Sequence, residues 1–125
     1  MSLVYEQIVL LKNSTLIFLS SLDRVRVRDE AFSTNLFNLR TDWLLPKFRE
    51  YTPSLGLGLT LTDPINDRQD RGLEKMINPN TRVSRRFGKN WGGNFRLEHQ
   101  RNYSKDEASF AFKKTIYAFE LEYLF

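Results

Sequence analysis

The sequence contains no cysteine, and it has no run of 18 or more apolar residues. Without cysteine the chain forms no disulfide and offers no thiolate to a metal, which suits a protein that crosses an oxidising compartment. Without a long apolar run the chain has no membrane-spanning helix. A membrane β-barrel is still compatible with this composition, because its strands alternate lipid-facing and lumen-facing residues.

A strong charge of one sign and a secretory leader are also missing. The net charge is +4, which permits a weak attraction to phosphates or anionic lipid headgroups but does not require one. Carboxylates are interspersed among the cations, which disfavours a nucleic-acid-binding stripe, and we expect no nucleic-acid partner. Met1-Ser2-Leu3 lacks the basic start of a signal peptide. If the protein is exported, its signal has been removed or replaced.

Residues for catalysis are scarce. The single histidine, His99, has the sequence parity of Phe95 and Leu97. The neighbouring carboxylate, Glu98, points to the opposite face if this segment is a strand, so the two side chains cannot form a Ser/His/acid site together. We therefore expect no catalytic residues, no metal site, no cofactor and no enzymatic activity.

What the sequence does contain is alternation. Its 125 residues suit one domain, and 14% of them are aromatic. From Phe110 to Phe125 no turn residue interrupts the chain. In a strand, successive side chains point to opposite faces. One face of this segment would then be aromatic and aliphatic, and the other would carry Lys114, Glu120 and Glu122. Such a strand needs an apolar partner along its length, which is either a second sheet or lipid.

Similar alternation predicts strands at 16–28, 35–45, 53–62, 81–88 and 94–103. The apolar stretch 3–19 is ambiguous between a strand buried on both faces and a short helix, and 63–80 reads as a long polar loop. The predicted strands are mostly 9 to 14 residues long, close to the roughly 9–11 that a tilted transmembrane strand needs. We therefore predict an all-β, antiparallel up-and-down transmembrane β-barrel, or a segment of one, with six to eight strands in a single domain 1–125.

The polar parity of these strands carries charges of both signs, which suits a network inside a barrel lumen. The candidate residues of this lumen charge network are Arg24, Arg26, Arg28, Arg40, Arg96, Glu98, Lys114, Glu120 and Glu122. An alternative for the arginines at 24, 26 and 28 is an anion-attracting strip in a pore. The network is the preferred reading.

The end of the chain resembles a known family. Tyr117, Phe119, Leu121, Tyr123 and Phe125 form an alternating apolar series that ends on an aromatic residue. This series resembles the C-terminal β-signal of bacterial outer-membrane β-barrel proteins, which their assembly machinery reads. The glycine often found upstream in that signal is replaced here by Lys113 or Thr115.

The resemblance implies that the protein is located in the bacterial outer membrane, with the lipid bilayer, the assembly machinery and possible further barrel chains as partners. Barrels of this family have an even number of strands. Either an eighth strand lies in 3–19 or 63–80, or the chain is a C-terminal fragment or a subunit of a larger barrel.

The functional expectation is a porin-like pore-forming or transport role, or a structural role in the membrane. The alternative is a soluble antiparallel β-barrel or sandwich that binds a small apolar ligand or a protein partner.

Overall fold

The computed structural model describes residues 2–26, 33–65, 72–105 and 110–123. These residues form seven strands of 10 to 14 residues. Their bounds are β1 (Ser2–Leu11), β2 (Ser14–Val25), β3 (Thr34–Leu44), β4 (Tyr51–Pro64), β5 (Glu74–Phe87), β6 (Trp91–Tyr103) and β7 (Phe112–Tyr123). The strand count lies within the predicted range of six to eight.

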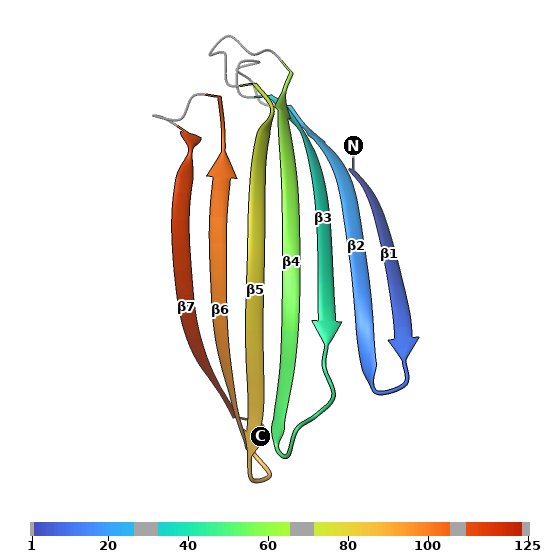
Figure 1. Cartoon of the computed structure of the whole chain (residues 1–125), viewed down its shortest axis with the longest axis vertical. Helices are drawn as coiled ribbons and strands as arrows, with labels where there is room; N and C mark the ends of the chain where they lie inside the picture. Colours follow the sequence, from blue (N-terminus) through green and yellow to red (C-terminus); the bar gives the residue numbers. More distant parts are fainter. Residues whose placement is uncertain (1, 27–32, 66–71, 106–109, 124–125) are drawn as a thin grey trace.

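The seven strands form one sheet in the order β1-β2-β3-β4-β5-β6-β7, and each neighbouring pair is antiparallel. The predicted all-β, up-and-down antiparallel fold is confirmed. The sheet is not closed, since β1 and β7 lie at its two edges (Figure 1). One end of the sheet, here called the short-turn end, has connections of two, six and three residues at 12–13, 45–50 and 88–90. The connections at the opposite, long-loop end span 26–33, 65–73 and 104–111.

The structure resolves one segment that was ambiguous in the sequence and corrects the prediction for another. The stretch 3–19 contributes to β1 and β2, which form a hairpin and not a helix. The prediction of a polar loop over 63–80 is wrong in its bounds, because β4 continues to Pro64 and β5 begins at Glu74. Pro79 explains the error. It lies inside β5, where the ladder to β6 skips from Ile77 to Asn80, because proline has no N–H to donate.

The sheet is a single layer without a core. In the described ranges no hydrophobic side chain is buried and there is no helix long and apolar enough to span a membrane. The accessible surface is 9349 Å². A compact globular monomer of 14.8 kDa exposes about 7,000 Å². The sheet therefore leaves much apolar surface for something else to cover.

The ladder register assigns the side chains to two faces. The apolar face carries the odd-numbered residues of β1 and of β3 to β7, together with the even-numbered residues of β2. The polar face carries the others. The parity of β2 differs from that expected, since Leu16 pairs with Trp43 and Leu22 with Phe37. The sequence was ambiguous there because both parities of 16–19 are apolar.

Candidate functional site

The middle of the apolar face is a band of mainly aliphatic and aromatic side chains, with Thr41, Thr81 and His99 among them. Leu55, Leu57 and Leu59 lie on β4 beside β3 and β5. On β7, Tyr117 is 71% exposed and Phe119 67% exposed. A monomer in water rarely leaves a contiguous apolar surface of this extent uncovered, so the band marks a contact surface.

A row of aromatic residues borders this band at the short-turn end. Its members are Trp43, Tyr51, Phe87, Trp91 and Tyr123, from five successive strands. The rings of Trp91 and Tyr123 are 4.9 Å apart. Trp43 Nε1 donates to the Ser14 hydroxyl over 3.1 Å. The Tyr123 hydroxyl accepts a hydrogen bond from Asn90 in a turn. Trp43 and Tyr123 therefore have an apolar body on the band and a polar atom bonded at the turn end, as aromatic residues at a membrane–water interface do.

Cations border the same band at the long-loop end. They are Arg24, Lys75, Arg101 and Lys113, all on the apolar face. Arg101 and Lys113 are directly opposite each other in the β6–β7 ladder, and the Arg101 guanidinium lies 4.7 Å from the centre of the Tyr103 ring. Long basic side chains of this kind cover apolar surface with their stems and keep the charge in water.

The polar face has a hydrogen-bonded network centred on Glu98. Asn78 Nδ2 donates to Glu98 Oε1 over 2.8 Å, and Gln100 Nε2 donates to the same oxygen over 2.5 Å. Arg96 Nε lies 3.9 Å from Glu98 Oε2, and the Glu98 side chain is only 13% exposed. A half-enclosed carboxylate needs such partners, because an unpaired one is costly.

Smaller polar clusters extend this network across the sheet. Thr60 Oγ1 donates to Asn38 Oδ1 over 2.9 Å, and Asn38 Nδ2 donates to the Ser21 hydroxyl over 3.1 Å. Toward β7, Asn94 Nδ2 donates to Glu120 Oε2 over 2.9 Å. Side-chain hydrogen bonds on the polar face thus link β2 to β4 and, separately, β5 to β7.

Of the two glycines of β4, one makes room for this polar layer. A Cβ on Gly56 would lie 2.5 Å from Asn80 Nδ2 and 2.7 Å from Asp42 Oδ1. A Cβ on Gly58 would meet Asn78 at an ordinary 3.4 Å. The alternation of leucine and glycine in β4 therefore has a cause on each face: leucines form the band, and Gly56 admits the neighbouring polar side chains.

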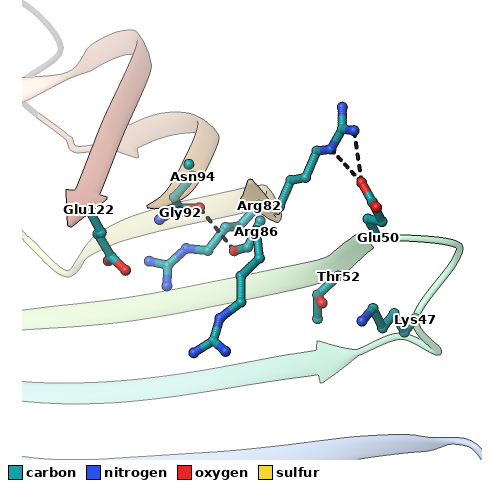
Figure 2. A pocket seen from close by; sticks show the side chains of 11 residues that line it. Lys47, Glu50, Thr52, Arg82, Arg86, Gly92, Asn94 and Glu122 are labelled. Carbon is teal, nitrogen blue, oxygen red and sulfur yellow. Dashed lines mark hydrogen bonds and ion pairs between the residues drawn. The ribbon is translucent and has the colours of Figure 1, made fainter. Parts of the chain in front are cut away.

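A hollow of about 570 Å³ lies toward the short-turn end, with lining residues from the β3–β4 connection, β4, β5, β6 and β7 (Figure 2). The guanidinium groups of Arg82 and Arg86 border it, and Glu122 stands across from them. Arg85 Nη2 lies 2.8 Å from Glu50 Oε2 at its rim. In the described part of the chain Arg82 and Arg86 form no ion pair, so the hollow attracts anions.

The structure brings together part of the predicted charge network. Arg40, Arg96 and Glu98 line one small hollow of about 160 Å³ on the polar face. Arg40 also pairs with Asp42, with 2.6 Å between Arg40 Nε and Asp42 Oδ2. Lys114, Glu120 and Glu122 lie on the same face of β7. These six predicted members therefore share one face of the sheet, on β3, β6 and β7.

Of the remaining three predicted members, one lies on the opposite face, one follows the end of β2 and one lies outside the described residues. Arg24 pairs with Asn35 and lies on the apolar face, because β2 has the opposite parity to the one expected. Arg26 follows the end of β2. Arg28 lies outside the described residues, as does Phe125 of the predicted assembly signal. Tyr117, Phe119, Leu121 and Tyr123 all lie on the apolar face of β7.

Sequence reasoning missed Asn78, Asn80 and Arg82, which line the same hollow as Glu98. The first two fell in the predicted loop. The alternation of Met76, Asn78 and Asn80 with Lys75, Ile77 and Pro79 could have indicated a strand. Pro79 favoured a loop instead. His99 lies on the apolar face, with Nδ1 2.9 Å from the Thr115 hydroxyl.

The β1–β2 hairpin departs from this two-faced pattern. On its polar face stand Val4 at 62%, Ile8 at 57% and Leu10 at 79% exposure. Ile8 pairs with Ile17, and Leu19 pairs with Glu6. The hairpin is thus apolar on both faces.

Comparisons of the chain with protein-family models, curated proteins and solved structures give no match.

Proposed function

We propose that this chain forms part of the wall of an outer-membrane β-barrel, with a porin-like pore-forming or transport role or a structural role in the membrane. The observation that carries the proposal is the apolar band. It extends across a single-layer sheet and has an aromatic row, which includes Arg85, along one border and cations along the other. No second layer covers it among the described residues.

The height of the band supports this proposal. On β6, Trp91 in the aromatic row and Arg101 in the cationic border are ten residues apart. Ten residues of antiparallel strand span about 34 Å, and a tilt of about 40° reduces this to about 26 Å along the bilayer normal. Outward-facing apolar bands of membrane barrels are about 25 Å tall.

The polar face supports the same proposal from the other side. Its charges are of both signs and several are hydrogen-bonded, as expected for side chains that face an enclosed aqueous lumen. The arginines of the 570 Å³ hollow favour anionic solutes if this lumen conducts.

The competing proposal is a soluble antiparallel β-barrel or sandwich whose apolar face binds a small apolar ligand or a protein partner. It requires an apolar cover that the described residues do not supply. The two proposals predict different solubility for the purified chain. If the purified chain is folded and monomeric in buffer without detergent, the membrane proposal is wrong. Folding only in detergent micelles or lipid vesicles supports it.

The resemblance to the β-signal gives a second test. Phe125→Ala, or deletion of Phe125, should lower the amount of folded protein in the outer membrane more than Glu120→Ala does. The reason is that the assembly machinery of this family reads the terminal aromatic residue. Folded protein is measured as the heat-modifiable band on a gel of outer membranes. Equal amounts from both variants would contradict the β-signal assignment.

A further inference from the structure

Three cations on the apolar face gather where β6 ends and β7 begins, at the long-loop end (Figure 1). Arg101 of β6 lies directly opposite Lys113 of β7 in the ladder. Lys75 of β5 is opposite Tyr103, so it lies diagonally across from Arg101. Side chains that are directly opposite have Cβ atoms about 5 Å apart, and like charges in these positions destabilise a sheet. An anion between the two cations would remove this repulsion.

The described carboxylates do not supply this anion. Lys75, Arg101 and Lys113 form no ion pair within the ranges that the structure describes. Asp63 is on the same face, but it belongs to β4 and has no ion pair within these ranges either. Asp106 and Glu107, in the connection from β6 to β7, lie outside the described residues.

A hollow of about 420 Å³ adjoins the two cations of β6 and β7. The end of β6 and the start of β7 line it, and its described lining contains Arg101 and Lys113 but no carboxylate. The Arg101 guanidinium lies over the Tyr103 ring, 4.7 Å from its centre. Asn102 Nδ2 donates to the Phe110 carbonyl over 2.8 Å and so joins the two strand ends beside the hollow. The hollow therefore offers an anion two cationic partners from neighbouring strands.

The opposite border of the apolar band differs in this respect. Arg85 also has its place on the apolar face, among the aromatic residues at the short-turn end. Its Nη2 lies 2.8 Å from Glu50 Oε2, so the chain itself neutralises this cation. The cations at the long-loop end have no such partner among the described residues, which favours an anion from outside.

The position of the cluster indicates which kind of anion it meets. If the proposed function holds, on which this inference rests, the apolar face lies in lipid. Arg101 is ten residues from Trp91 along β6, which corresponds to about 26 Å along the bilayer normal. Arg101 then lies at the border of the hydrocarbon region, at the level of the lipid headgroups.

We propose that Arg101 and Lys113, with Lys75 beside them, bind the phosphate group of an anionic membrane lipid. The guanidinium of Arg101 has parallel N–H donors that match a phosphate, and the ammonium of Lys113 adds a second positive charge. The acyl chains of the same lipid lie along the apolar band beside Tyr117 and Phe119. This continuity of a cationic hollow with an apolar surface favours a lipid over a free phosphate ion.

Quenching of a fluorophore beside the hollow tests the proposal. Thr115→Cys places a single thiol in the cysteine-free chain, two residues from Lys113 and on the same face. The thiol carries a bimane label, and the full chain is reconstituted in phosphatidylcholine vesicles. The vesicles contain either phosphatidic acid or phosphatidylcholine with a nitroxide on one acyl chain. The dependence of quenching on the fraction of each nitroxide lipid gives the relative affinities of the two lipids for this surface.

We expect nitroxide phosphatidic acid to quench at lower fractions than nitroxide phosphatidylcholine. Changing both cations, Arg101→Gln with Lys113→Gln, should lower this preference by about 30-fold. The matched control is Arg24→Gln, which removes a cation from the same border but on β2. Its distance from β6 is about 19 Å along the sheet, beyond the Debye length of about 10 Å at 0.1 M salt, so the preference should be unchanged. Equal quenching of all variants by nitroxide phosphatidylcholine shows that they insert alike.

Several results would overturn the inference. Equal quenching by the two lipids means that the surface does not select an anionic lipid, and a preference that the double variant retains places the binding elsewhere. A preference that appears only after Asp106→Asn and Glu107→Gln assigns these carboxylates as the partners of the cations. Loss of the preference in inorganic phosphate, but not in sodium chloride of equal ionic strength, assigns the hollow to free phosphate.

A chain that neither lipid quenches is a different outcome. Position 115 is then not in contact with lipid, and the proposed function itself is contradicted. Quenching by nitroxide phosphatidylcholine without a preference for phosphatidic acid, in contrast, leaves the proposed function intact and contradicts the phosphate site alone.

Discussion

The β1–β2 hairpin and the five strands β3 to β7 have the same antiparallel backbone pairing but differ in the polarity of one face. From β3 to β7, one face is a leucine and aromatic band and the other is a hydrogen-bonded polar layer. In the hairpin, Ile8 and Leu10 stand on the face that is polar elsewhere. A strand with two apolar faces is typical of one that is covered on both sides. We therefore expect the polar face to border water along β3 to β7 and to be covered by an apolar partner at the hairpin.

The largest effect is expected from a charge placed in the apolar band. Phe119→Lys should lower the stability of the folded form in lipid vesicles by about 2–4 kcal/mol, because a lysine near the middle of the lipid face must leave water. The matched control is Ile116→Lys on the polar face, which brings a cation beside Glu98. Urea titrations of both variants measure the difference. If Phe119→Lys is neutral or stabilising, this face is in contact with water.

A smaller effect should separate the hairpin from the remaining strands. Leu19→Ser on the polar face of β2 should cost about 1–3 kcal/mol of stability, because we expect an apolar partner to cover Leu19, which is 37% exposed in the sheet alone. On the same face of β4, Thr62→Ser should change the stability by about 0.5 kcal/mol or less. The same titration in vesicles compares them. Equal costs at the two positions would remove the distinction between the hairpin and the rest of the sheet.

The polar layer of β3 to β7 can be tested at its centre. Glu98→Ala should destabilise the fold by about 1–3 kcal/mol, since it leaves the amide groups of Asn78 and Gln100 without their shared acceptor. Glu98→Gln keeps an acceptor at this position and should lose less. Glu120→Ala removes one hydrogen bond from a more exposed carboxylate and should cost less than Glu98→Ala. The ranking of the three unfolding midpoints checks this account.

Much of the fold could be predicted from the sequence because alternation is a local signal. The strand over 112–123 and the leucine–glycine strand over 53–62 needed no tertiary information. Prediction from alternation failed where the local preference of a residue differs from the structure that it adopts in the sheet. Pro79 indicates a loop in isolation, yet the structure accommodates it within β5 at the cost of a gap in the ladder.

The candidate site was harder to predict, because membership of a face depends on register. Ile17, Leu19 and Leu22 are all apolar, so the sequence could not show which parity of β2 joins the apolar face. Arg24 was assigned to the polar face for this reason. The central role of Glu98 also depends on Asn78 and Gln100, which come from two strands and meet only in the folded sheet.

The most direct test of the central claim is a nitroxide scan of positions 115 to 122 in lipid vesicles, with single cysteines in the cysteine-free chain. If the apolar face contacts lipid and the polar face borders water, spin labels at 115, 117, 119 and 121 should be relaxed mainly by oxygen. Labels at 116, 118, 120 and 122 should be relaxed mainly by a water-soluble nickel chelate. Relaxation by the nickel chelate at both sets of positions would contradict the account.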